Sequence, residues 1–195
     1  YLSDSYWGKP VPSFGEIDSS VFILGLAPGA HGSNRTGRMF TGDSSGNLLY
    51  PVLYDNELCN QPKSKNSQDG LELIDCYISA VVRCVPPQNK PTLYEIETCR
   101  RYLLQEIKLL INLKVVVALG KIAFDQYIKC MKLLGISSDS KPLFGHNKRY
   151  TLSNGITLIS SYHPSQQNTL TGRLTPEMFN EVFKLAKAVS LQNKH

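Results

Sequence analysis

Short apolar runs that alternate with helical patterns set the strongest limit on what this chain can fold into. The clearest run is Lys-Val-Val-Val-Ala-Leu-Gly at residues 114–120, whose β-branched side chains favour a strand buried on both faces. Three similar runs occupy residues 21–24, 76–84 and 156–165. Helical patterns occupy residues 48–58, 92–110 and 121–134 and the segment from Thr175 onwards. The alternation predicts an α/β fold: a three-layer sandwich with a central, mostly parallel four-stranded sheet covered by helices on both faces.

Length and composition are typical of one domain over residues 1–195. Hydrophobic residues make up 42% of the chain, and no apolar run reaches the ~18 residues that a membrane span requires. A formal charge of +5 mildly favours polyanionic partners. Five cysteines without secretory context indicate reduced thiols or ligands. We therefore expect a cytoplasmic protein that does not contact a membrane.

Three unusual segments follow predicted strands: the first loop (residues 25–47), the middle segment (residues 83–91) and the second loop (residues 162–173). In open parallel sheets, ligands bind beyond the carboxyl ends of the strands. The three segments meet at that edge, so we expect them to form a single site.

The first loop combines glycines with cations and an aromatic side chain. It lacks the phosphate-binding patterns of common nucleotide folds, which argues against a nucleotide hydrolase. The glycines are compatible with a tight surface turn, but the surrounding polar residues favour a flat ligand attached to phosphates. In the second loop, His163 could be structural, yet the amides behind it and the apolar Leu170 suit a wedge that enters a DNA groove.

The sequences "GLAPGAHGSNRTGRMFTGD" and "SYHPSQQNTLTGRLTP" resemble the two signature motifs of the uracil-DNA glycosylase superfamily, specifically its family five, the type-B enzymes. "RCVPPQNKPTLYEIETC" resembles the iron–sulfur segment of families four and five, and the resemblance covers about residues 6–179. It implies hydrolysis of the bond between deoxyribose and uracil or another deaminated base. The expected partner is double- or single-stranded DNA associated with the nucleoid, and we expect the chain to act as a monomer.

The resemblance also implies roles for individual residues. Phe40 matches the aromatic that stacks on the flipped base, although a core phenylalanine is the alternative. His163 would donate a hydrogen bond to the base O2 as negative charge develops there. Backbone N–H groups in the segment Ala27, Pro28, Gly29 and Ala30 would stabilise the same charge, although Pro28 itself has no N–H to contribute.

At the positions where better-known families carry the carboxylate that activates the attacking water, this sequence has other residues. Ala27 stands where family one has an aspartate, and Leu26 where family four has a glutamate. The remaining candidates for positioning the water are Asn34 and Asp43, with His31 as a third. We expect Asn34 to orient the water through its carbonyl and Asp43 to hold the loop.

Base choice is expected to depend on Ala80. Strict uracil enzymes of the superfamily have an asparagine on the middle strand whose side chain reads the exocyclic group on C4 of the base. In this sequence the same stretch is "ISA", and the matching position is Ala80. Without that hydrogen bond, discrimination should weaken, and hypoxanthine should also be removed. Alternatively, Ser79 or backbone groups read the edge.

The predicted DNA contacts come from both loops. Arg35, Arg38 and Arg173 are expected to meet phosphates, with solvated surface cations as the alternative. The polar side chains expected at the groove are Ser165, Gln166, Gln167 and Asn168.

Cys84 and Cys99 match the third and fourth ligands of the [4Fe–4S] cluster of families four and five. Cys76 cannot join them, since eight strand residues separate it from Cys84 by roughly 26 Å. Cys59 and Cys130 are expected to be buried thiols. The chain begins at Tyr1, and we expect the other two ligands upstream of it. The alternative is two unrelated thiols.

Two other functions remain open at this point. One is a strict family-four-like uracil glycosylase, against which Leu26 argues. The other is a lesion-binding DNA protein without catalysis, which the absent carboxylates suggest.

Overall fold

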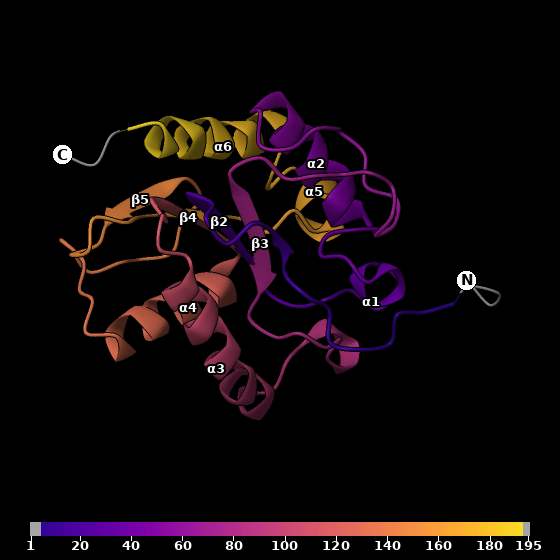
Figure 1. The fold of residues 1–195 in the computed structure, drawn as a ribbon, viewed down its shortest axis with the longest axis horizontal. Helices are drawn as coiled ribbons and strands as arrows, with labels where there is room; N and C mark the ends of the chain where they lie inside the picture. Colours follow the sequence, from indigo (N-terminus) through magenta and orange to yellow (C-terminus); the bar gives the residue numbers. More distant parts are fainter. Residues whose placement is uncertain (1–4, 193–195) are drawn as a thin grey trace.

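The centre of the computed structural model, which describes residues 5–192, is a six-stranded sheet with the order β1-β3-β2-β4-β6-β5 (Figure 1). The four inner strands run parallel. They are β2 (Val21–Gly25), β3 (Cys76–Ala80), β4 (Val115–Leu119) and β6 (Thr157–Ser161). This confirms the predicted α/β fold with a central, mostly parallel sheet.

Two short antiparallel strands extend the sheet beyond the four predicted ones. Strand β1 (Phe14–Gly15) pairs with β3, and β5 (Lys148–Thr151) pairs with β6. The first has two residues and the second is largely exposed and polar, so neither carries the apolar pattern of a buried strand. Edge strands with charged side chains also resist pairing with other chains.

Helices cover both faces of the sheet, and this is why the inner strands are almost entirely buried. Helices α2 (Ser44–Asp55) and α6 (Pro176–Ser190) pack on one face, and α3 (Leu93–Leu109) and α4 (Lys121–Leu133) on the other (Figure 1). All residues of β2, β3 and β4 are buried, with no alternation of polar and apolar side chains.

Local signals determine where the long helices begin. Thr92 and Glu95 form the predicted capping box of α3, and Thr175 caps α6 as predicted. Helix α2 begins at Ser44 rather than near residue 48, because the Asp43 side chain accepts a hydrogen bond from Gly46 N–H at 3.0 Å.

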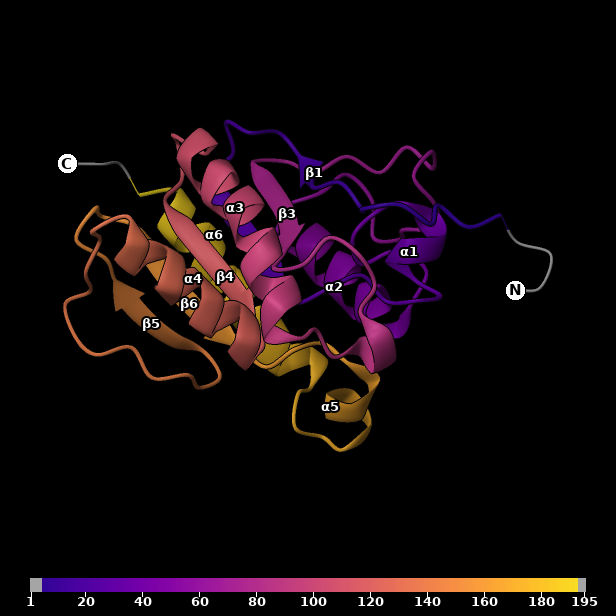
Figure 2. The same cartoon turned by 90° about the horizontal axis from the view of Figure 1, so that it is seen from below.

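Three short helical turns lie in the segments that follow β2, β3 and β6. They are α1 (Ser33–Thr36), η1 (Pro87–Asn89) and α5 (Gln166–Leu170). We expected a loop at α5, but Ser165 caps it. Figure 2 shows α5 projecting from the body of the protein. No helix among residues 5–192 is long and apolar enough to cross a membrane.

Candidate active site

A cavity of about 740 Å³ opens at the carboxyl ends of β2, β3 and β6. The first loop forms most of its wall, and Ala80, the end of the middle segment and the start of the second loop complete it. Three segments far apart in the sequence therefore meet in one place, as the strand pattern predicts for an open parallel sheet.

Phe40 forms part of the cavity wall and has an unusual backbone. Its φ angle is 54°, a left-handed conformation that bulky residues rarely adopt. The ring lies against Gly25 at the end of β2, where an added β-carbon would approach Phe40 Cζ to 2.8 Å. Gly25 pairs in register with Ala80, so the absence of large side chains at both positions leaves room beside the ring. The alternative of a core phenylalanine holds only in part, because Phe40 is buried and yet faces the cavity.

The turn at the start of the first loop has free backbone donors. The Gly29 carbonyl accepts hydrogen bonds from the N–H groups of Gly32 and Asn34 at 3.2 and 3.1 Å. Among the described residues, none accepts from the N–H groups of Ala27, Gly29 or Ala30, and all three residues line the cavity. Pro28 is buried and also lines it. This arrangement can stabilise a developing negative charge.

His163 lies two residues after the end of β6 and lines the cavity beside Phe40, with the two ring centroids 6.0 Å apart. Burial lowers the pKa of His163 from 6.5 to about 4, so the imidazole is neutral at pH 7. A neutral imidazole has one N–H donor and one acceptor. The side chain of Asn168 donates to the His163 carbonyl at 2.9 Å. Asn168, which we expected to meet DNA, thus also holds the histidine backbone.

The two candidates for positioning the water lie in different places. Asp43 lines the cavity, and its Oδ2 is so close to Gly32 that an added β-carbon there would lie 2.2 Å away. Asn34 does not line the cavity, and its Nδ2 lies 3.5 Å from the Ala30 carbonyl oxygen. Of the two, Asp43 is the one that faces the cavity, whereas we expected Asn34 to orient the water. Asp43 Oδ1 also caps α2, so the expected structural role holds as well.

The three predicted phosphate-binding arginines differ in exposure. Arg38 is buried and forms an ion pair with Asp69, so its predicted contact with phosphate is wrong. Arg35 is partly buried and donates to the His31 carbonyl at the cavity wall, at 2.8 Å. Arg173 is exposed, and its guanidinium lies 4.5 Å from the centre of the Tyr162 ring.

The second loop presents polar side chains and one apolar tip. Ser165, Gln166 and Gln167 line the cavity, and both glutamines are exposed. Leu170, at the end of α5, is 78% exposed. An exposed leucine on a projecting turn beside a cavity is the geometry that a wedge requires.

Sequence reasoning missed residues at the end of the middle segment. Gln88, Asn89 and Lys90 line the cavity, although the segment was assigned only cluster ligands. Gln88 and Asn89 have φ angles of 54° and 56°. The double proline before them signalled a constrained turn, but it did not show that the turn faces the first loop.

His31 was a distant candidate and has an unexpected partner. It lines the cavity, and its Nδ1 lies 2.6 Å from the hydroxyl of Tyr6. The backbone of Trp7 and Gly8 also bonds to Arg35 and Asn34, so the start of the described chain braces α1.

The five cysteines divide into two groups. Cys59, Cys76 and Cys130 are buried, and burial raises the pKa of each thiol, to about 11 for Cys59 and Cys130. Cys84 is exposed and Cys99 partly so. The predicted ligand pair, Cys84 and Cys99, is therefore the accessible pair, whereas the other three thiols are enclosed in the core. Within residues 5–192, no three His, Cys, Asp or Glu side chains are grouped to hold a metal ion.

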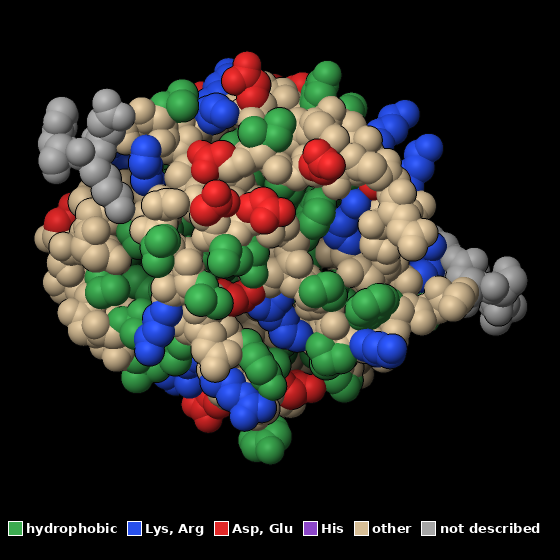
Figure 3. All heavy atoms as spheres, in the orientation of Figure 1, with side chains coloured by type: hydrophobic (Ala, Val, Ile, Leu, Met, Phe, Trp, Pro, Cys, Tyr) green, Lys and Arg blue, Asp and Glu red, His purple; other side chains and the backbone are tan. Residues whose placement is uncertain are grey.

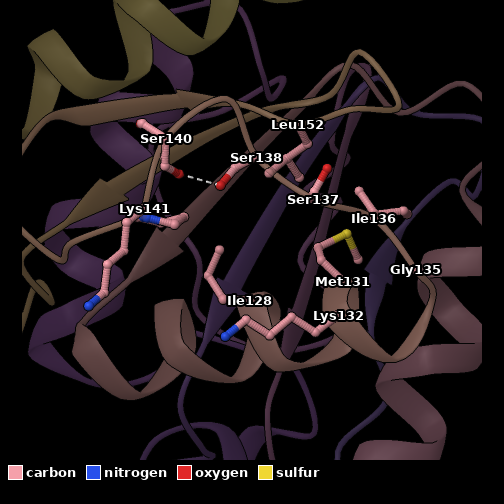
Figure 4. A pocket seen from close by; sticks show the side chains of 11 residues that line it. Ile128, Met131, Lys132, Gly135, Ile136, Ser137, Ser138, Ser140, Lys141 and Leu152 are labelled. Carbon is pink, nitrogen blue, oxygen red and sulfur yellow. Dashed lines mark hydrogen bonds between the residues drawn. The ribbon is translucent and has the colours of Figure 1, made fainter.

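Other surface features lie outside this site. A cavity of about 440 Å³ between α4 and residues 135–142 has an apolar floor and two lysines at its rim, and it shares no residue with the three segments (Figure 4). Figure 3 shows acidic and basic side chains mixed on one face. The distribution of charge on that face therefore does not indicate a DNA-binding surface.

The mostly parallel sheet, covered by helices on both faces and carrying a cavity at the carboxyl ends of its strands, places the chain among the α/β proteins that bind a ligand at this edge. A family model described as the uracil DNA glycosylase superfamily matches residues 12–187, and the chain belongs to that superfamily.

Within the superfamily, the chain is similar to type-5 uracil-DNA glycosylases. It is 46% identical to the one from Thermus thermophilus, over 97% of this chain and 84% of the relative. It is also 46% identical to that from Mycobacterium bovis, over 97% of this chain and 70% of the relative. The protein from Pyrobaculum aerophilum is 42% identical, over 96% and 80%.

Proposed function

We propose that this protein is a DNA glycosylase that hydrolyses the N-glycosidic bond of uracil in DNA, leaves an abasic site and acts in base excision repair. The carrying observation is the 740 Å³ cavity, in which Phe40, His163 and unpaired backbone N–H groups converge. The names of the type-5 relatives support the choice of uracil. The oxygen of water bonds to the sugar carbon as the bond to the base nitrogen breaks; the base leaves as an anion and takes up the proton that the water loses.

Each step has a residue suited to it. Phe40 stacks on the extruded base. Neutral His163 donates its N–H to the base O2, and the N–H groups of Ala27, Gly29 and Ala30 add to the stabilisation of the leaving charge. Asp43 accepts a hydrogen bond from the water, aided by a largely dissociated, oxocarbenium-like sugar.

The DNA is held by the exposed part of the site. Ser165, Gln166 and Gln167 contact the strand, and Leu170 fills the gap that the extruded base leaves. Arg35 and Arg173 meet phosphates.

The enzyme has relaxed base choice, because nothing at Ala80 reads the C4 edge. Ala80 is buried and lines the cavity, so no side chain larger than a methyl group occupies this position. The mutation Ala80→Asn should lower hypoxanthine release relative to uracil by about tenfold or more. If the native protein cuts uracil and leaves hypoxanthine at single turnover, this role of Ala80 is contradicted.

Cys84 and Cys99 provide two of the four thiolates of a [4Fe–4S] cluster, and the other two come from outside the described residues. A cluster of this type serves structure here, because base hydrolysis exchanges no electrons. Protein that carries the full ligand set, purified without oxygen, should contain about four irons. Cys84→Ser should remove the iron, whereas Cys130→Ser at a buried thiol should keep it. Iron-free native protein would contradict the assignment.

Release of free uracil tests the function itself. The protein is incubated with a uracil-containing oligonucleotide, and both free base and alkali-labile sites are measured. His163→Ala should lower the single-turnover rate by about 10²–10³-fold, the cost of losing one such donor. Binding without any release would instead indicate a lesion-binding protein.

A further inference from the structure

Arg38 is a buried, multiply bonded charged side chain of the first loop that does not line the cavity. Its terminal Nη2 donates to both carboxylate oxygens of Asp69 at 2.8 Å and to Ser64 Oγ at 2.6 Å. Its Nε donates to Thr41 Oγ1 at 3.2 Å. A charge buried this deeply must be paired, and here the partner comes from a polar loop, residues 60–70.

Asp69 is in turn held by its own loop. The backbone N–H groups of Lys65 and Leu71 donate to its carboxylate at 2.6 and 3.0 Å. Burial raises its pKa, but these bonds and the Arg38 guanidinium outweigh that effect and lower the pKa to about 2. The carboxylate is therefore charged at any pH at which the protein would act.

These bonds fasten the chain on both sides of Phe40. Thr41 Oγ1, which accepts from Arg38, lies 2.6 Å from Ser64 Oγ and 3.2 Å from the Met39 carbonyl oxygen. The Met39 carbonyl also accepts from the Tyr50 hydroxyl at 2.6 Å. Phe40 lies between Met39 and Thr41 with its left-handed φ of 54°, a conformation that persists only where its surroundings impose it.

We propose that Arg38, through its ion pair with Asp69, is a positioning residue that holds Phe40 in the geometry needed to stack on the base. This rests on the stacking role of Phe40 under the proposed function. It brings the 60–70 loop, which lines no part of the cavity, into the construction of the site.

A double-mutant cycle between Arg38→Met and Phe40→Leu tests this coupling. Single-turnover uracil release is measured over a range of enzyme concentrations, which separates the maximal rate from half-saturation. Arg38→Met should lower the maximal rate by about tenfold in the native background but by less than about twofold with Phe40→Leu. Half-saturation and the salt dependence of DNA binding should stay unchanged, because the Arg38 guanidinium is buried in its ion pair with Asp69.

Lys114→Met is the matched control. Lys114 is a partly buried cation at the amino end of the inner strand β4, opposite the carboxyl ends that carry the site, and its Nζ donates to the carbonyls of Ser190 and Gln192 at 2.6 and 3.0 Å. Its loss should lower the melting temperature without changing the rate. Thr41→Val is a milder second variant: it removes the hydroxyl between Arg38 and the Phe40 backbone, keeps the ion pair, and should show the same coupling if Arg38→Met does not fold.

The outcomes separate the inference from the function on which it rests. If the rate losses of Arg38→Met and Phe40→Leu multiply in the double variant, the two residues act independently. That result would overturn the positioning role and leave the proposed function standing. A full rate for Phe40→Leu would overturn the stacking role, and this inference with it. Absence of uracil release by the native protein would overturn the proposed function itself.

Discussion

The first and second loops meet at one cavity but are built in opposite ways. The first loop is fastened by bonds to other parts of the chain and by its own cap: Arg38 pairs with Asp69, the start of the described chain bonds to α1, and Asp43 caps α2. The second loop carries a short, exposed helix whose side chains mostly point outwards, with Leu170 at its tip. One loop is a rigid wall, and the other is a projecting contact surface.

This difference suggests a division of labour. A wall that must hold a base and a water within a fraction of an ångström needs preorganised groups. A surface that meets a flexible DNA strand needs exposed amides, a wedge and a cation. Changes in the first loop should therefore lower the chemical rate, and changes in the second should lower DNA affinity. His163 belongs to both, since it starts the second loop and faces the wall of the first.

The largest effect is expected at Asp43. Asp43→Asn should lower the single-turnover rate by about 10²–10⁴-fold, because the water loses its charged acceptor. DNA affinity should change little. Asn34→Ala, on the same loop but away from the cavity, is the matched control and should retain most of the rate. If the two variants behaved the other way round, Asn34 would be the residue that positions the water.

A smaller effect, on binding, is expected at the tip of the second loop. Leu170→Ala should weaken affinity for uracil-containing duplex DNA by about tenfold, since less apolar surface fills the gap in the stack. Affinity for single-stranded DNA should change less, because it has no complementary strand to keep apart. Equal losses on both substrates would show that Leu170 is not a wedge.

The arginines give a sharper contrast between the loops. Arg173→Gln should lower the slope of log affinity against log salt by about one unit, as one phosphate contact is lost. Arg38→Gln should leave the slope unchanged, because its guanidinium is buried. An unchanged slope for Arg173→Gln would remove Arg173 from the DNA footprint.

The smallest change is expected in the pH profile. The neutral form of His163 is favoured in the folded protein, where its pKa is about 4 rather than 6.5. As pH falls from 6.5 to 4, the unfolded chain takes up a proton that the folded protein does not, so this residue lowers stability over that window and has no effect above it. The single-turnover rate should show no titration at 6.5. A step there that disappears in His163→Gln would contradict the lowered pKa.

The location of the site was predictable because strand ends are local features. The pattern of apolar runs placed the two loops and the middle segment at one edge, and the cavity lies there. The same local reasoning predicted the caps at Thr92 and Thr175. It failed for Arg38, because an arginine among glycines looks exposed until Asp69, 31 residues later, is brought beside it.

The sequence by itself therefore determined the fold class, the edge that carries the site and the family to which the chain belongs, because these depend on periodicity and on contiguous motifs. Only the tertiary structure decided which polar side chains face the cavity. Asp43 rather than Asn34, the turn of Gln88 and Asn89, and the burial of Arg38 all depend on contacts between segments far apart in the chain. A motif fixes the order of residues along a loop, whereas packing against distant segments sets the direction in which each side chain points.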